Sequence, residues 1–440
     1  MQRTKNQPRL IQAVIDMFTL PDLRRKILFT LGILIAFRFV AHVPLPGVDI
    51  HALENLFGQN QLYGMLDLFS GGAMMRFSVA AMGVYPYITA SIIMQLLVPV
   101  IPSLQALSRQ GEAGQHKINR ITHLLTLPLA ALQSYGLLAI LRAQTPPIIS
   151  NLEPATTACI ILSMTAATIF LVWLGELITE RGVGNGISLI IFAGIVASLP
   201  SMVGSAFIAK ANPLGLTTFI ILGLLTLVFI VIFTEAHRRI PVQYARSSFR
   251  AGRLYRQSGS TYIPLRVNTA GMIPLIFAIA LMQFPGLIAT WFMNPGGQNP
   301  NFWNNIYHIF NSGNAAPIGL AYWIPYFFLT MAFAYFYTMI IFEQMSLPQT
   351  LQQQGGFIPG VRPGKATADY LNKTIKNLTF GGALFLGIVA IMPFIAREIT
   401  DVRALTLSST ALLIAVGVAL DTMKQLEAQL TMRRYEGFLK

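Results

Sequence analysis

The sequence predicts an all-α polytopic membrane protein with ten transmembrane helices. Three observations predict this fold class: 54% of the 440 residues are hydrophobic and only 11% are charged, ten apolar stretches approach the length of a membrane span, and basic residues gather in alternate loops. A soluble domain has about 25% charged residues, and a spanning helix needs about 20 predominantly apolar ones. A large soluble helical bundle is the alternative, but too many stretches stay almost uncharged over roughly 18 residues or more.

The ten expected spans share an apolar composition, with charged residues only towards their ends. They lie at residues 27–41, 78–101, 121–141, 158–178, 187–208, 216–233, 269–292, 321–342, 378–395 and 404–420. The first span follows 26 residues that contain six Lys and Arg and leads into HVPLPG. Because this is no small-residue cleavage site, we expect the segment to be retained rather than removed as a signal peptide.

The basic residues predict the orientation. Of the 31 Lys and Arg residues, 25 lie in the N-terminal segment, the C-terminal tail and the gaps at 102–120, 179–186, 234–268 and 343–377, whereas the opposite set of loops holds five. Cationic loops are retained on the cytoplasmic side of a membrane. Both termini are therefore expected in the cytoplasm, which requires an even number of spans.

Ten spans divide into two halves of five, and an odd number makes the halves cross the membrane in opposite directions. Inverted repeats of this kind usually place a pathway at their interface. We therefore expect two inverted pseudo-symmetric halves, at 27–208 and 209–421, around a central pore. A cytoplasmic N-terminus at 1–26 and a cytoplasmic tail at 422–440 flank them.

The polar residues exclude several classes of protein. All 17 acidic residues lie in loops, termini or span ends, whereas ion-coupled transporters commonly hold ionisable groups at mid-membrane. The zinc motif HExxH and the nucleotide motif GxxxxGK[ST] are both absent. Ser188 is expected to cap or pack a helix, and the single cysteine, Cys159, is expected to be a small buried side chain. We therefore predict no enzymatic activity, no cofactor and no metal site.

The prolines within the expected spans include Pro86, Pro128, Pro274 and Pro325. A proline inside a helix frees a backbone carbonyl and bends the helix, which membranes tolerate where neighbours re-satisfy that carbonyl. These residues therefore predict kinks that could act as hinges, with a simple packing role as the alternative.

Two cytoplasmic loops are longer than a connector needs. Residues 237–267 interleave seven arginines with four aromatic residues, and the alternation of Ile240, Val242 and Tyr244 predicts a projecting β-hairpin. Arginine and aromatic side chains suit RNA or an acidic protein partner. The alternative is that these charges only fix the topology.

The second long loop, 343–376, contains GGFIPGVRPGKAT, with glycine and proline on both sides of Arg362. These residues predict tight turns that hold the guanidinium in a fixed, exposed position. A solvated connector is the alternative.

Residues 62–77, LYGMLDLFSGGAMMRF, lie between the first two spans and are apolar but too short to cross a bilayer. The Gly71–Gly72 pair gives this segment a flexible joint before the next span. We expect a re-entrant or interfacial element, since such backbone is tolerated at membrane depth only where protein or a cavity surrounds it.

Four long segments together carry a resemblance to a known family. They are HVPLPGVD at 42–49, LFSGGAMMRFSVAAMGVYPYITASIIMQLL at 68–97, WLGELITERGVGNGISLIIFAGIVASLP at 173–200 and GGFIPGVRPGKAT at 355–367. They resemble the SecY/Sec61-alpha family, whose bacterial members are the channel-forming subunits of the Sec protein translocase. The external stretch 294–314 and the short tail after Asp421 depart from the family pattern.

The resemblance implies a passive protein-conducting channel of the bacterial cytoplasmic (inner) membrane. Such a channel passes unfolded secretory polypeptides across the membrane and releases transmembrane segments laterally into the phospholipid bilayer. The implied partners are SecE and SecG, the SecA motor, the ribosome, and signal peptides and nascent chains. A secondary transporter of a small solute and a membrane insertase or scaffold without a continuous pore are the rival hypotheses.

The resemblance also implies roles for particular residues. An aliphatic pore ring would consist of Val84, Ile88, Ile187, Ile191, Ile276 and Ile414. Residues four apart share a helix face, so 84 and 88, like 187 and 191, would point the same way. Without the resemblance, these would be ordinary packing residues.

Three further sets of residues follow from the same resemblance. Segment 62–77 would be a weakly anchored plug, with Leu62, Met65, Leu66, Phe69, Gly71 and Gly72. Thr89, Gln95 and Asn268 would tune a lateral gate between the second and seventh spans. Docking of SecA or the ribosome would use Arg238, Arg239, Arg246, Arg250, Arg256 and Arg362.

Overall fold

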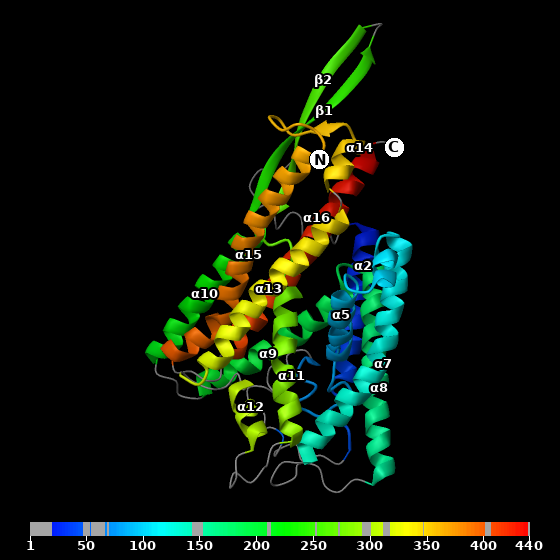
Figure 1. Cartoon of the computed structure of the whole chain (residues 1–440). Coiled ribbons are helices and arrows are strands. Elements are labelled where there is room, and N and C mark those ends of the chain that lie inside the picture. Colours follow the sequence, from blue (N-terminus) through cyan, green and yellow to red (C-terminus); the bar gives the residue numbers. More distant parts are fainter. Residues whose placement is uncertain are drawn as a thin grey trace. The chain divides into compact units, whose positions relative to one another are not determined.

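The computed structural model of the chain is predominantly α-helical, as the sequence predicts (Figure 1). It describes residues 20–46, 53, 67, 70–142, 153–208, 213–250, 253–271, 273–292, 301–310, 317–345, 347–400 and 406–438. The described helices are α2 (Pro21–Val40), α5 (Tyr85–Leu97), α6 (Pro102–Ser108), α7 (Glu112–Arg142), α8 (Pro154–Arg181), α9 (Gly186–Ile208), α10 (Pro213–Glu235), α11 (Ile273–Phe292), α12 (Phe302–Phe310), α13 (Leu320–Met345), α14 (Leu347–Gln353), α15 (Lys365–Thr400) and α16 (Thr406–Phe438).

Nine of the ten expected apolar ranges are helical over nearly their whole length, and the range 78–101 is helical only over Tyr85–Leu97. By length and hydropathy, four helices of the described chain could each cross a membrane: Glu112–Ala139, Pro154–Arg181, Leu320–Gln353 and Lys365–Met392. The helices α5 and α6 together could form a fifth span, with a bend of 102° between them. Shorter apolar stretches lie in α9, α10 and α11.

Two of the four prolines expected to kink helices instead begin them. Pro86 is at the start of α5, and Pro274 is the second residue of α11. Proline suits the first helical turn, because the N–H it lacks would have no partner there. Pro128 and Pro325 do lie inside α7 and α13, as predicted.

The chain divides into two compact units. The first contains Met1–Ala211, Pro285–Asn314 and Ile414–Lys440, and the second contains Asn212–Phe284 and Ala315–Leu413. Within the first unit α7 packs against α5 and α8, and α8 packs against α2 and α9. Within the second unit α15 packs against α10 and α13, and the rings of Phe233 and Phe385 stack with centroids 4.3 Å apart.

The predicted hairpin is present in the second unit. Strand β1 (His237–Arg250) pairs antiparallel with β2 (Arg253–Arg266) along its whole length, from His237 opposite Arg266 to Arg250 opposite Arg253. A two-residue strand from the other long loop, β3 (Gly356–Phe357), pairs with the opposite edge of β1. In Figure 1 the two long strands form a ribbon that projects beyond α14.

The turn between α8 and α9 is held by close glycine contacts. A Cβ on Gly186 would collide with the carbonyl oxygen of Gly175, so the start of α9 lies directly on the backbone of α8. The Gly186 N–H donates to Thr179 Oγ1 at 2.9 Å, and the Ser188 N–H donates to Asn185 Oδ1 at 3.1 Å. Asn185 therefore caps α9. Ser188, which was a candidate for the cap, instead donates its backbone N–H to the capping side chain.

Gly186→Ala is expected to destabilise the protein, because overpacking of a tight contact costs about 1–3 kcal/mol. Gly223→Ala is the matched control, since Gly223 lies inside α10 and a Cβ there meets nothing within 4 Å. Thermal unfolding of the detergent-solubilised protein should show a lower midpoint for Gly186→Ala and an unchanged or higher one for Gly223→Ala. Equal midpoints for the two variants would show that the glycine contact is unimportant.

Candidate functional site

The predicted pore-ring residues are mostly buried aliphatic side chains at the starts of helices. Val84 precedes the first residue of α5 and its carbonyl accepts from the Ile88 N–H at 3.1 Å, while Ile187 and Ile191 occupy the first turns of α9. The half-buried member is Ile187, and the other five are buried. Five of the six belong to the first unit, and Ile276, on α11, belongs to the second.

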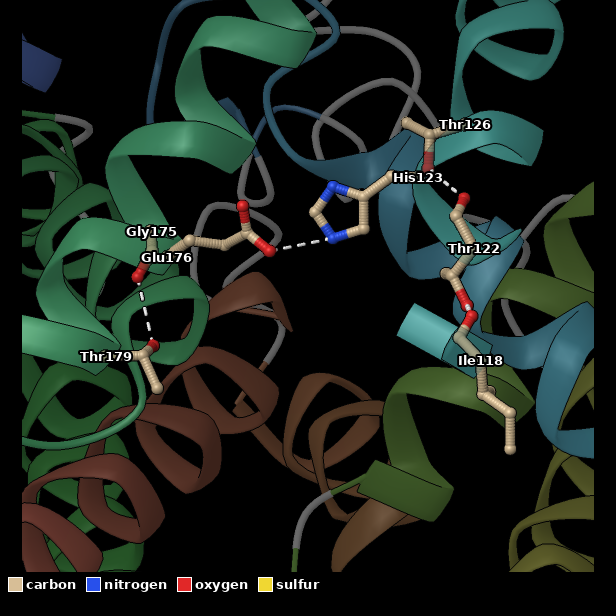
Figure 2. A network of polar contacts seen from close by, with 7 residues as sticks. All are labelled: Ile118, Thr122, His123, Thr126, Gly175, Glu176 and Thr179. Carbon is tan, nitrogen blue, oxygen red and sulfur yellow. Dashed lines mark hydrogen bonds and ion pairs between the residues drawn. The ribbon is translucent and has the colours of Figure 1, made fainter. Parts of the chain in front are cut away.

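The helix that carries Ile187 and Ile191 is fixed from its α8 side. A Cβ on Gly175 would lie 2.8 Å from Cγ1 of Ile187, so this small residue leaves room for the Ile187 side chain. One turn further on, Thr179 Oγ1 donates to the Gly175 carbonyl and accepts from Gly186 (Figure 2). The predicted ring member Ile187 therefore sits at a place where α8 and α9 are locked together.

The same turn of α8 is tied to α7 by a side-chain pair. His123 Nε2 lies 2.9 Å from Glu176 Oε1 (Figure 2). The His123 ring also makes an edge contact with Tyr87 of α5. Both partners are partly exposed, so the pair adds little stability by itself. The pair instead positions helices, because His123 connects α7 to α8 and to α5 near the start of α9.

Of the predicted plug, the structure describes the glycine joint and the residues that follow it. Leu62, Met65, Leu66 and Phe69 lie outside the described residues. Gly71 has a φ of +69°, and a Cβ there would lie 2.8 Å from Cα of Gly194 on α9. Gly71 is therefore required both for its backbone conformation and for its contact with α9.

Hydrogen bonds hold the chain around this joint. A guanidinium nitrogen of Arg38, Nη1 on α2, donates to the Gly71 carbonyl at 2.6 Å. On the chain that leaves the joint, the N–H groups of Leu45 and Val79 bond to the carbonyls of Phe77 and Val43. These bonds hold the described part of the segment in place, and the weak anchoring of the segment stays a prediction.

Asp67 organises the turn after the joint. Its Oδ1 accepts hydrogen bonds from the N–H groups of Met74 and Met75 and from Ser70 Oγ, at 2.9–3.1 Å. Burial raises the pKa of Asp67, and these hydrogen bonds oppose that rise. The sequence signal for this role is a single carboxylate within the apolar run 62–77.

The predicted lateral-gate residues occupy different surroundings. Thr89 donates to the Tyr85 carbonyl on its own helix and accepts from Gln133 of α7 at 3.4 Å. Gln95 donates to Ser91. Asn268 precedes α11 and is nearly buried. The side-chain oxygens of Gln95 and Asn268 are buried and have no partner within the described part of the chain.

The two long basic loops form one folded body, which we call the loop module (β1, β2 and residues 347–375, which include α14, β3 and the first turns of α15). Its core joins side chains from both loops: Ile240, Val242, Leu265, Leu351, Ile358, Leu371 and Ile375. Where β3 meets β1, a Cβ on Gly356 would lie 2.9 Å from the Tyr244 ring. The loops therefore share a hydrophobic core. Loops that only fixed the topology would not need such a core.

The loop module presents its arginines in fixed places. Arg362 is exposed between Gly360 and Gly364, which have φ of +83° and +101°, and its carbonyl accepts from Thr367 Oγ1. Arg238 and Arg239 are exposed at the base of the hairpin, and the Arg239 guanidinium lies 4.9 Å from the centre of the Tyr262 ring. Arg246, Arg250 and Arg256 lie on β1 and β2, and their side chains are outside the described part.

One minor expectation is wrong, because Cys159 is exposed on α8 rather than buried. An exposed thiol on an apolar helix is compatible with a lipid-facing position. Among the described residues, no group of three or more His, Cys, Asp or Glu side chains could hold a metal ion.

Comparisons with known proteins show the family of the chain. The sequence model of the SecY family matches residues 78–423. The protein translocase subunit SecY of Streptomyces scabiei is 41% identical over 98% of this chain and 100% of its own length.

Two solved structures share the fold. One is a SecY structure, described with the statement that the plug domain of the SecY protein stabilises the closed state of the translocation channel and maintains a membrane seal (TM-score 0.64, 19% identity, 92% of this chain and 91% of that chain). The other is Sec61 in the canine ribosome-channel complex (TM-score 0.62, 17% identity, 92% of this chain and 91% of that chain). With a family match over most of its length and a relative this similar from end to end, the chain belongs to the SecY family.

Proposed function

We propose that this chain is the channel-forming subunit of a protein translocase in the bacterial cytoplasmic membrane. It passes unfolded secretory polypeptides across the membrane and releases apolar segments sideways into lipid. The observation that carries this proposal is the end-to-end similarity to protein translocase subunit SecY, at 41% identity. The glycine-seated joint at Gly71, placed against α9, supports a closed resting state.

The proposed channel has ten spans in two inverted halves, with both termini in the cytoplasm. Support comes from the ten apolar ranges, of which nine are helical over nearly their whole length and one in part, and from the concentration of basic residues in alternate loops. Energy for transport must come from a partner, because the sequence contains no nucleotide-binding GxxxxGK[ST] motif.

In this proposal the aliphatic ring seals the resting channel. A narrow apolar constriction excludes water and ions by dewetting, yet flexible aliphatic side chains can part around an extended polypeptide. The buried, uncharged side chains of Val84, Ile88, Ile191, Ile276 and Ile414 suit this role. The first turns of α9 are locked to α8, so the ring opens through side chains and helix movement rather than by fraying of α9.

The plug closes the channel reversibly. Its described anchor to the rest of the chain includes one charge-assisted hydrogen bond from Arg38, whereas the bonds to Asp67 lie within the segment itself. A hydrogen bond contributes about 0.5–1.5 kcal/mol net, and one to a charged group about 1.5–3 kcal/mol. The anchor therefore amounts to a few kcal/mol, which an entering signal peptide or nascent chain can offset.

The lateral gate uses polar groups that leave some of their possible hydrogen bonds unmade in this state. The buried oxygens of Gln95 and Asn268 lack partners within the described residues, and such groups cost about 1–3 kcal/mol each. A gate state that satisfies them would be favoured by that amount, so these residues, with Thr89, are suited to tune opening towards lipid.

The loop module is the docking surface for the partners that drive transport. Its rigid core holds Arg362 and the hairpin base in one body, and arginine forks suit RNA phosphates and acidic side chains. We assign this surface to the ribosome and to the SecA motor. SecE and SecG complete the complex.

Photocrosslinking of a stalled secretory chain tests the proposed function. Crosslinking side chains placed at Ile191 and Ile276 should capture successive positions along the chain, because every residue in transit passes the ring. Leu224 is the control, since it is 60% exposed on α10 and should give no capture. Capture at Leu224 equal to that at Ile191 would favour a scaffold without a pore.

The seal can be tested by adding one methyl group at either glycine of the joint. Gly71→Ala and Gly72→Ala share the strain of a positive φ, but only Gly71→Ala adds a clash with α9. In proteoliposomes with a halide-sensitive dye, we expect the resting ion leak to rise several-fold in Gly71→Ala and much less in Gly72→Ala. An equal leak in both variants would show that the seal does not depend on the Gly71–Gly194 contact.

Reversal of charge at Arg362 tests the docking surface. Arg362→Glu should lower SecA-driven export in vesicles by about tenfold or more, because each loss of about 1.4 kcal/mol in docking energy is tenfold in affinity. Lys117→Glu makes the same charge change at an exposed site on α7, in the other unit, and should leave export nearly normal. Normal export by Arg362→Glu would contradict the proposal that SecA docks on the loop module.

A further inference from the structure

Helix α12 separates its apolar and polar residues onto different faces. It reads FWNNIYHIF over Phe302–Phe310. At 100° per residue, Phe302, Trp303, Ile306, Tyr307, Ile309 and Phe310 share one side, and Asn304, Asn305 and His308 share the other. Asn301, just before the helix, would extend the polar side. The helix contains no Lys, Arg, Asp or Glu.

The helix is attached to the end of an apolar helix. The ring of Trp303 lies 5.1 Å from that of Phe292, the last residue of α11, and both belong to the first unit. Because α11 is among the apolar helices, its end marks the approximate level of the membrane surface. Trp303 therefore holds α12 at that level.

Part of the apolar side of α12 is uncovered. Phe302 is 71% exposed and Ile309 is 41% exposed, and the two lie about 20° apart around the helix axis. Trp303 and Tyr307, about 100° and 140° further round, are only half-buried against the protein. On the polar side, Asn305 and His308 are exposed. The helix thus has a flank towards the protein, an exposed apolar flank and an exposed polar flank.

We propose that α12 lies in the outer membrane interface, with Phe302 and Ile309 in the acyl region of the lipid and Asn305 and His308 in water. An amphipathic helix with one apolar face rests in this plane, and Trp and Tyr rings favour the same level. This contact anchors the outer end of α11.

The observations favour lipid over a protein on this flank. A specific protein interface buries about 800 Å² on each partner, which is far more than two exposed side chains of a two-turn helix provide. Without cationic side chains, α12 binds through apolar burial rather than through attraction to anionic headgroups. The anchoring should therefore be the same in zwitterionic and anionic bilayers.

Spin-label accessibility tests this placement. In the full-length protein carrying Cys159→Ala and reconstituted in lipid nanodiscs, nitroxides are attached one at a time at positions 302, 309, 305 and 308. Collisions with oxygen report the lipid phase, and collisions with a water-soluble nickel chelate report the aqueous phase. The oxygen-to-nickel ratio should be several-fold higher at 302 and 309 than at 305 and 308, in both phosphatidylcholine and phosphatidylglycerol.

Either of two results would overturn the proposal. Equal, high access of the nickel chelate at all four positions would place α12 in water, and low access of both reagents at 302 and 309 would show that protein covers this flank. As an independent measurement, brominated lipids should quench the fluorescence of the native protein more than that of Trp303→Phe. Equal quenching would also count against it. This anchoring requires a membrane-embedded chain but not a protein-conducting pore, so its failure would leave the proposed function untouched.

Discussion

Backbone N–H and C=O groups at membrane depth need partners inside the protein, because lipid offers none. Helices meet this requirement by themselves, but the chain between Gly71 and Tyr85 is not a regular helix. Its groups are instead satisfied by Arg38, by the carboxylate of Asp67 and by pairing with residues 43–45. We propose this chain as a closure element, which is stable only where these specific contacts exist and movable because they are few.

The helix α9 supports this closure element at two glycines. Gly186 meets the backbone of α8 at the start of the helix, and Gly194 meets Gly71 about two turns later. Ile187 and Ile191 lie between these two points. The proposed ring residues of α9 are therefore fixed by close backbone contacts on both sides, where one added methyl group would shift the helix.

The sequence predicts much of the secondary structure because helices, hairpins and glycine turns depend on local patterns. Apolar length located the helices, alternation around Val242 located the hairpin, and glycine and proline located the turn at Arg362. Contacts between distant segments have no such pattern. The pairing of β1 with the two-residue strand β3, which joins the loops into one module, is an example.

In the candidate site, too, local patterns are predictable from the sequence and contacts between distant segments are not. Spacing by four predicts that Val84 and Ile88 share a face, as do Ile187 and Ile191, but hydropathy does not encode how residues from different helices meet. Arg38 and Asp67 were counted only as charges, although each bonds to the backbone of the plug joint. Pro86 and Pro274 were expected to bend helices, because sequence alone places a helix start only within a few residues.

The central claim is that a plug and an aliphatic ring keep the resting channel closed and that a polypeptide opens it. Single-channel recording in a planar bilayer measures this directly, before and after a secretory chain is trapped in the protein and then released. The account predicts no ion conductance at rest, and a large, transient conductance when the trapped chain leaves before the plug returns. A steady conductance at rest, or none after release, would contradict it.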